Sequence, residues 1–242
     1  MIHRIFLAGA GGAIGRRLTP LLVAAGHPVV GTTRSVEKAA AIRELGAEAV
    51  VVDVFDASAL ARAVAAAAPD MVIHQLTDLP RGLDPSKMDE AAQRNARIRT
   101  EGTRNLVDAA VAAGARRLIA QSIAWAYAPG AEPYDENAPL DLAAEGRRAV
   151  SVGGVAALER AVLGAPLEGI VLRYGQLYGP GTGVDVRDGA SPVHVDDAAR
   201  AALLALDHGS PGVYNIAERG GAVDVGKADR ELGWRAEPRD PG

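Results

Sequence analysis

Two kinds of segment alternate along most of this chain. Short runs of β-branched or apolar residues are followed by longer segments rich in Ala, Leu and Arg, in which apolar positions recur at helical spacing. The short runs predict strands and the longer segments predict helices, an alternation typical of βαβ units around a parallel sheet. Such crossovers are nearly always right-handed. The pattern therefore predicts an α/β fold with a Rossmann-like doubly wound parallel sheet and a ligand crevice at the carboxyl ends of its strands.

The pattern also gives approximate bounds for each element. We predict strands near Arg4–Ala8, Pro28–Thr32, Ala49–Val52, Met71–His74, Arg117–Ala120, Gly169–Arg173 and Val213–Ile216. Helices are predicted near Ala13–Ala25, Val36–Leu45, Ala57–Ala67, Met88–Ala113, Gly146–Leu163, Asp196–Leu206 and Val225–Leu232. The Gly- and Asp-rich segment Tyr178–Pro192 is predicted to be a loop that faces the active site. Residues 1–242 are expected to form a single domain, in which roughly 178–242 contribute a small, trimmed substrate-covering region.

Composition narrows the classes of partner. The formal net charge is -4, with acidic and basic residues interspersed, so no basic stripe is available for nucleic acid or an anionic membrane. The chain has no cysteine, which excludes disulfides, thiolate metal sites and cysteine nucleophiles. No His, Asp or Glu grouping has the spacing of a metal site, so no metal is expected. No apolar run approaches the ~18 residues that span a membrane. We expect a cytoplasmic, soluble protein that acts on a small molecule.

The chain begins with a predicted strand, a glycine-rich turn and a predicted helix. Gly9, Gly12 and Gly15 give the spacing G-x-x-G-x-x-G, which supplies a tight turn, a close backbone approach to a pyrophosphate and close packing of helix on strand. The positive end of the helix would face the phosphates. The sequence therefore predicts a dinucleotide site built from Gly9, Gly11, Gly12, Ala13, Ile14 and Gly15. The alternative is a turn with a purely structural role.

The end of the second predicted strand favours one dinucleotide over another. NAD binders usually place Asp or Glu there, whereas this chain has Arg34, which could pair with a 2′-phosphate. NADP(H) is therefore preferred over NAD(H). Arg16 could share this role, and the alternative is that Arg34 is simply solvated. Asp53 and Val54, just after the third strand, suit the adenine; Asp53 could instead belong to a loop or cap.

Ordered motifs along nearly the whole chain resemble one family. They are the glycine turn, Asp53, Val72–Thr77, Glu101–Leu106, Leu172–Gly181, His194–Ala199, Gly212–Ile216 and Glu231–Trp234. Together they resemble the extended short-chain dehydrogenase/reductase superfamily, in its NAD-dependent epimerase/dehydratase branch. The resemblance implies that Leu76 and Thr77 flank the cofactor's ribose, and that Gln121, Tyr174 and Leu177 lie near the nicotinamide.

The departures from that family concern its chemistry. The family uses a tyrosine, its pKa lowered by a lysine four residues on, to exchange a proton while hydride moves. Aligned on Glu159, the tyrosine position holds Ser151 and the lysine position holds Val155. The family's Ser/Thr position falls on Ile123, one residue after Ser122, and its supporting asparagine is replaced by Arg99. The resemblance therefore implies an atypical member that lacks the usual Tyr-Lys pair.

Other side chains could replace the missing pair. Tyr127, at the exit of the fifth strand, is the candidate proton donor or substrate hydrogen bonder, with Ser122 as a second catalytic candidate; Tyr127 could equally line the pocket wall with Trp125. His194 precedes two acids and could act as a base, although capping of the next helix is favoured. Arg173 or Arg81 could hold an anionic substrate. His74, at the end of a buried strand, is predicted to be structural.

Three functions are compatible with these residues. The first is an NADP(H)-dependent oxidoreductase or epimerase/isomerase that acts on a carbonyl or hydroxyl of a small metabolite. The second is a non-redox cyclase, dehydratase or isomerase of a biosynthetic pathway, in which the site binds and orients the substrate. The third is a non-catalytic NADP(H)-sensing or binding protein. The resemblance also makes a homodimer an expectation, since helix-pair dimers are common in that family.

Overall fold

The computed structural model describes residues 1–237 and 239, Arg81 without its side chain. Within these residues a seven-stranded parallel sheet has the order β3-β2-β1-β4-β5-β6-β9. Its strands are β1 (Ile5–Ala8), β2 (Val29–Thr33), β3 (Glu48–Val51), β4 (Met71–His74), β5 (Arg117–Ile123), β6 (Glu168–Tyr174) and β9 (Gly212–Ile216). A two-stranded parallel sheet joins β7 (Gln176–Tyr178) and β8 (Pro192–His194). The predicted doubly wound α/β fold is confirmed.

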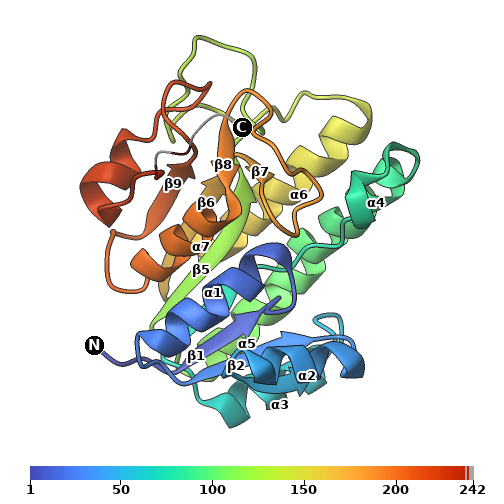
Figure 1. Cartoon of the computed structure of the whole chain (residues 1–242). Helices are drawn as coiled ribbons and strands as arrows, with labels where there is room; N and C mark the ends of the chain where they lie inside the picture. The colour runs from blue at the N-terminus through green and yellow to red at the C-terminus, as the bar shows by residue number, and fades with distance from the viewer. Residues whose placement is uncertain (238, 240–242) are drawn as a thin grey trace.

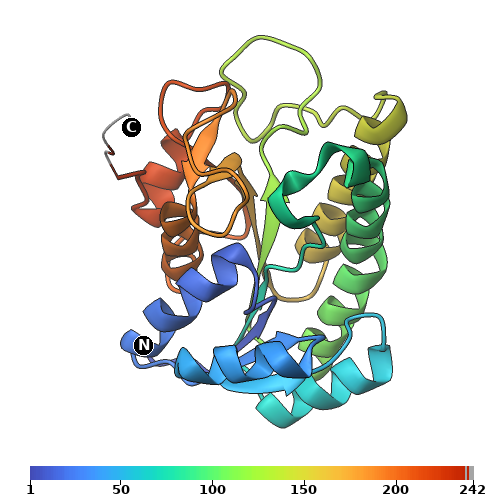
Figure 2. The same ribbon diagram turned by 45° about the vertical axis from the view of Figure 1, so that its right-hand side comes forward.

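Helices cover both faces of the large sheet, as Figures 1 and 2 show. Helices α1 and α7 pack side by side on one face, and on the other face α5 packs against both α3 and α6. The helices are α1 (Ala13–Ala24), α2 (Val36–Glu44), α3 (Ala57–Ala67), α4 (Met88–Arg97), α5 (Thr103–Ala112), α6 (Gly146–Leu163) and α7 (Val195–Leu204). Short turns are η1 (Arg81–Leu83), η2 (Pro85–Lys87), and the π-helical η3 (Ile98–Gly102) and η4 (Ala228–Leu232).

Strand β1, in the middle of the sheet, is apolar at every position because both of its faces are covered. In β1, Ile5 and Leu7 belong to the core on the α1 and α7 side, whereas Phe6 and Ala8 belong to the core under α3, α5 and α6. All four residues are at most 1% exposed. Side chains of a strand alternate between faces, so a continuous apolar run fills two cores at once.

The strand order reverses at β1, which lies between β2 and β4. Helices after β1 and β4 leave the sheet on opposite faces, and such a point opens a ligand crevice at the carboxyl ends of the strands. The glycine turn therefore lies at the position where this fold binds ligands. The β7-β8 sheet follows directly from β6, at the same edge of the large sheet.

Three predicted elements differ from the structure. The long helix predicted near Met88–Ala113 is interrupted by the π turn Ile98–Gly102. The predicted loop Tyr178–Pro192 begins and ends in short strands, because Leu177 pairs with Val193 across the small sheet. The final helix, predicted near Val225–Leu232, contains the π turn Ala228–Leu232. The assignment of residues 178–242 to substrate covering stays a prediction.

Candidate functional site

The turn between β1 and α1 requires glycine at its two ends. Gly9 has φ +95°, and a Cβ there would lie 2.6 Å from the Gln75 carbonyl oxygen. A Cβ at Gly15 would lie 2.2 Å from the Gly9 carbonyl oxygen. The Gly12 amide donates to that same oxygen at 3.0 Å and closes the turn. Gly9 is therefore required by the close approach of the turn to the backbone after β4, and Gly15 by the packing of helix α1 on the turn itself.

The middle of the turn fits a dinucleotide. A Cβ at Gly11 would meet only the Lys38 side chain, at 3.9 Å, and Gly12 has an ordinary φ of -79°. Internal packing therefore does not require glycine at Gly11, and a bare backbone there leaves room for a pyrophosphate. The first amides of α1, at Ala13 and Ile14, lack intrahelical partners by the geometry of a helix start. The Ile14 side chain is buried, so only its backbone faces the crevice.

Cationic side chains surround this turn. Arg34 follows β2, and its guanidinium lies 3.2 Å from the Asp78 carboxylate in a partly exposed ion pair. Arg16 donates through Nε to the Gly11 carbonyl oxygen at 3.0 Å. Lys38, on α2, extends over Gly11. The sequence analysis missed Lys38, although its position one turn into the helix after Arg34 could have indicated it.

The predicted adenine and ribose positions lie on either side of the turn. The Asp53 carboxylate accepts from the Phe55 amide at 3.0 Å, and Val54 is buried against Gly102. After β4, Leu76 is half-buried and Thr77 is exposed. The fold brings these positions to the same edge as the glycine turn, and their contacts with a cofactor stay predictions.

The loop after β4 is held by a residue that the sequence analysis missed. The Asn95 amide group donates to the Asp78 carbonyl oxygen and accepts from the Asp78 amide, both at 3.0 Å. Asn95 is 5% exposed on α4. Its contacts fix the backbone that carries the Asp78 carboxylate toward Arg34. Only the packing of α4 on this loop shows the role of Asn95.

Ser122 lies beneath the crevice. Its side chain is 0% exposed, and its hydroxyl donates to the Glu159 carboxylate at 2.8 Å. Arg173 donates to both oxygens of the same carboxylate, at 2.9 and 2.7 Å. Neither Ser122 nor Arg173 is therefore placed to contact a substrate, contrary to the roles suggested for them. The Arg81 side chain lies outside the described part of the structure.

Tyr127 is mostly buried at the wall of a cavity. It is 4% exposed, its hydroxyl donates to Asn215 Oδ1 at 2.6 Å, and its ring stacks on Tyr134. Burial raises the pKa of its phenol, the opposite of the change that a proton relay needs. This placement favours the interpretation of Tyr127 as part of the pocket wall, and its proposed catalytic role stays a prediction.

The predicted nicotinamide-side residues differ in exposure. Tyr174 is 1% exposed, and its hydroxyl accepts from Gln75 Nε2 at 3.4 Å, so its ring belongs to the core rather than to the crevice. Burial raises the pKa of its phenol strongly. Gln121, in β5, and Leu177, in β7, are only partly buried. Their contacts with a nicotinamide stay predictions, whereas Tyr174 can contribute only through packing.

An apolar cluster lies at the α6 positions that were predicted to correspond to the family's proton relay. Val155 is 0% exposed and packs with Ile123, Ala126 and Val152. Ser151 is 9% exposed, and its carbonyl oxygen accepts from the Arg99 guanidinium at 3.4 Å. No phenol or amine can act from α6 at these two positions. That the chain lacks the family's Tyr-Lys pair stays a prediction, because it depends on the alignment at Glu159.

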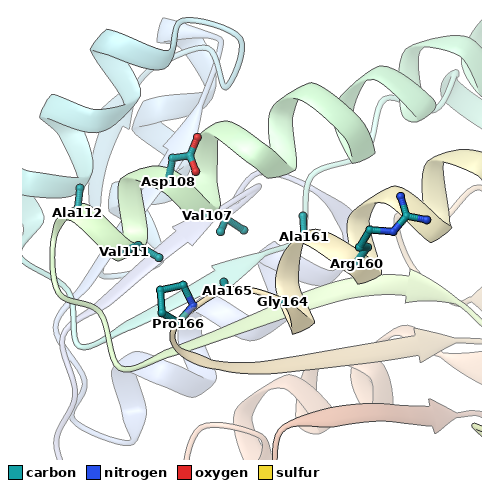
Figure 3. A pocket seen from close by; sticks show the side chains of 9 residues that line it. All are labelled: Val107, Asp108, Val111, Ala112, Arg160, Ala161, Gly164, Ala165 and Pro166. Carbon is teal, nitrogen blue, oxygen red and sulfur yellow. The ribbon is translucent and has the colours of Figure 1, made fainter.

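Two cavities differ in their relation to this edge. A cavity of about 270 Å³ is lined by Trp125, Tyr127, Tyr134, Arg148 and Gln176, among others, beyond the ends of β5 and β6. A larger one, of about 440 Å³, lies between the C-terminal ends of α5 and α6 (Figure 3). Those helices run antiparallel to the strands, so the larger cavity is at the opposite edge of the sheet. The smaller cavity is the candidate substrate pocket.

The two histidines singled out have structural contacts. His194 precedes α7, and its Nδ1 accepts from the Asp196 amide at 3.2 Å, which is a helix cap. His74 is 1% exposed; its Nδ1 accepts from the Leu76 amide and its Nε2 lies 3.0 Å from the Thr103 hydroxyl. Burial, with a contribution from the charge of Arg99, lowers the pKa of His74 to about 4. Both histidines therefore support backbone geometry.

The described residues contain neither a metal-binding cluster nor a membrane-spanning helix. Among residues 1–237 and 239, His, Asp and Glu side chains form no group of three that could hold a metal ion. Each helix in this part of the chain is too short or too polar to cross a membrane.

Comparison with known sequences adds two matches. The profile of the NAD(P)H-binding family matches residues 9–203. The chain is also similar to a Streptomyces sp. protein named 3-diazoavenalumate denitrifying reductase, at 43% identity over 89% of this chain and 76% of that protein. The family match begins at Gly9 and includes the glycine turn.

Comparison with solved structures shows the fold. A UDP-glucose 4-epimerase from Thermotoga maritima has a TM-score of 0.78 at 20% identity, over 97% of this chain and 94% of that one. The DesIV dTDP-glucose 4,6-dehydratase from Streptomyces venezuelae has 0.75 at 20% identity, over 98% and 93%. WbmG from Bordetella bronchiseptica, solved with NAD and UDP, has 0.75 at 21% identity, over 99% and 90%. At these identities the likeness extends to architecture only.

Proposed function

Because this chain belongs to the NAD(P)H-binding family, within the extended short-chain dehydrogenase/reductase superfamily, we propose that it is an NADPH-dependent reductase that replaces the diazo group of a small aromatic compound with hydrogen. The name of its Streptomyces relative supports the reaction class. The observation that carries the proposal is the apolar cluster around Val155, where a carbonyl reductase of this family would need its lysine.

This reaction does not need a proton relay. Reduction of a carbonyl creates an alkoxide, which a nearby acid must protonate. A diazonium carbon that accepts a hydride forms a C–H bond while its C–N bond breaks, and both electrons of that bond leave with N₂. No oxyanion develops at the reacting carbon and no acid is consumed. A site with Val155 and Ser151 in place of lysine and tyrosine suits this chemistry better than carbonyl reduction.

A bound dihydronicotinamide supplies the hydride. The chain's own groups would bind and orient the two reactants, which is the main source of rate when no acid or base takes part. The turn around Gly11 and Gly12 would hold the pyrophosphate. The cavity beside Trp125 and Tyr134 offers aromatic surface for the substrate's ring.

The preference for NADPH rests on charge around the turn. Arg34 directly follows β2, and Lys38 lies on the next helix, α2, with its side chain near Gly11; a 2′-phosphate bound beside them would carry about two negative charges. Neither position holds the acidic residue that would accept hydrogen bonds from a free 2′-hydroxyl. The cofactor is therefore proposed to be NADP(H).

Isotope transfer tests the proposed reaction. The protein is incubated with 3-diazonio-4-hydroxybenzoate and NADPH that carries deuterium at C4, one stereoisomer at a time. The expected products are N₂ and 4-hydroxybenzoate with one deuterium at the former diazo carbon, formed from one stereoisomer only. The same mixture without protein measures direct reduction of the diazonium ion by NADPH. Equal deuterium transfer from both stereoisomers, at the rate of the protein-free mixture, would refute the proposal.

The two alternatives predict other results in the same assay. A non-redox cyclase, dehydratase or isomerase would bind NADPH and leave it unoxidised. An NADP(H)-sensing protein would bind the nucleotide and change no small molecule. Stereospecific deuterium transfer excludes both, because it requires contact between cofactor and substrate on the protein.

A further inference from the structure

Arg99 occupies an unusual turn of backbone beside the candidate active site. It lies in the π turn Ile98–Gly102, which widens the helix between α4 and α5. Single π turns inside α-helices occur frequently at functional sites. The helix runs from the carboxyl edge of the sheet, and helical side chains lean toward the helix N-terminus. The Arg99 side chain is therefore directed toward the edge that carries the glycine turn.

Two observations place the Arg99 charge at that edge. Its Nη1 donates to the Ser151 carbonyl oxygen on α6, at the position of the family's catalytic tyrosine. Its charge also contributes to the low pKa of His74, the last residue of β4. The guanidinium therefore lies between α6 and the end of β4, next to the apolar cluster around Val155.

The guanidinium has few protein partners. Its hydrogen bond to Ser151 is long, at 3.4 Å, and among the described residues it forms no ion pair with a carboxylate. Glu159 is near enough to affect it, but both oxygens of that carboxylate are bonded to Arg173. Burial lowers the pKa of Arg99 to about 10, which still leaves it charged at neutral pH. Arg99 is half-buried, so its charge is partly removed from water without a carboxylate partner, and an anion in the crevice would stabilise it.

Small residues on α6 give this side chain its space. A Cβ at Gly154 would lie 3.0 Å from the Ala96 Cα and 3.4 Å from the Arg99 Cδ. Helices α4 and α6 therefore approach closely at Gly154, and the Arg99 stem lies along that contact. Ser151 is far smaller than the tyrosine of the family.

We propose that Arg99 binds an anionic oxygen of the substrate and fixes the ring beside the nicotinamide position. This inference rests on the proposed function for the identity of the substrate, and it names an oxyanion as the feature that the substrate must carry. The guanidinium would form charge-assisted hydrogen bonds and would neither give nor take a proton. Two groups of the substrate could supply this anionic oxygen: an oxygen conjugated with the diazo carbon, or a carboxylate on the ring.

Binding of the expected product tests the role of Arg99 without any turnover. Titration calorimetry, in saturating NADP⁺, compares 4-hydroxybenzoate, its methyl ester and benzoate. Arg99→Gln is expected to raise the dissociation constant of 4-hydroxybenzoate by about tenfold or more, the effect of losing a charge-assisted hydrogen bond. If wild type and Arg99→Gln bind the methyl ester equally, the carboxylate is the group that Arg99 binds. If they bind benzoate equally, it is the phenol oxygen.

Matched variants separate binding from folding. Arg104→Gln removes an exposed arginine of the next helix and is expected to bind the probe like the wild type. NADPH affinity should be unchanged in both variants. If Arg99→Gln does not fold, Arg99→Lys is used instead. Its ammonium is shorter and offers a single charged point, so it should bind 4-hydroxybenzoate severalfold more weakly than the wild type. Unchanged probe affinity in the folded Arg99 variant would overturn the inference. If no stereospecific deuterium transfer occurs but 4-hydroxybenzoate binding still depends on Arg99, only the proposed reaction is refuted.

Discussion

Replacing Arg34 with alanine is expected to weaken NADPH binding much more than NADH binding. In the structure the Arg34 guanidinium lies 3.2 Å from the Asp78 carboxylate, across the edge where β1 ends between β2 and β4. A 2′-phosphate would have to take this guanidinium from Asp78. The ion pair and the cofactor therefore compete for one cation, and the change in affinity is a difference between two interactions.

The magnitude follows from the exposure of the pair. Hydrogen bonds to charged groups contribute about 1.5–3 kcal/mol, and the Arg34 side chain is 55% exposed, which favours the low end of that range. The exposed pair with Asp78 contributes about 0–1 kcal/mol, and it is lost when NADPH binds. The net loss in Arg34→Ala is therefore about 1–2 kcal/mol, or roughly 5- to 30-fold in the dissociation constant.

Calorimetric titration with NADPH and, separately, NADH measures this difference. Asp78→Asn is the matched variant, because Asn95 holds the Asp78 backbone while the substitution removes the charge that competes for Arg34; it also removes the ion pair of Asp78 with Arg94. It is expected to strengthen NADPH binding severalfold in the wild type and to have little effect in Arg34→Ala. An equal loss of NADPH and NADH affinity in Arg34→Ala would refute the reasoning, because it would separate Arg34 from the 2′-phosphate.

Three further predictions concern the turn, the pocket wall and the pH dependence of stability. Gly11→Ala, where a Cβ would meet only the Lys38 side chain at 3.9 Å, should fold normally but bind NADPH at least about tenfold more weakly. Gly9→Ala, at φ +95°, should lower the melting temperature. Normal NADPH binding by Gly11→Ala would contradict the pyrophosphate assignment. Tyr127→Phe loses the hydrogen bond to Asn215 and should reduce the free energy of unfolding by about 1 kcal/mol, with kcat nearly unchanged; a large fall in kcat would instead make the phenol catalytic. His74, with a pKa of about 4 when folded and 6.5 when unfolded, binds more protons when unfolded, so stability should fall by about 3 kcal/mol as pH decreases from 6.5 to 4. Urea unfolding of wild type and His74→Asn across this range checks the last prediction, and an identical pH slope in both would contradict it.

The sequence was sufficient for features that depend on local spacing. The apolar runs identified the strands that form the large sheet, and Gly9 and Gly15 stand where the strand-turn-helix pattern placed them. The cap at His194 was also predictable, because a side chain that accepts from an amide two residues on depends on neighbours in the sequence. Family membership followed from ordered motifs, which record the same local requirements. Each of these features is fixed by backbone geometry within a few residues.

Tertiary structure alone decided how the chemistry-bearing side chains are used. Ser122 lies in β5 and Tyr127 shortly after it, yet their partners Glu159 and Asn215 are 37 and 88 residues away. Those contacts turn both hydroxyls toward protein groups. The uncommitted charge of Arg99 could not be seen either, because it depends on which carboxylates lie near and which already have partners. Spacing along a chain shows which face a residue occupies. Only packing between elements determines whether a polar group there is satisfied by the protein or remains available to a ligand.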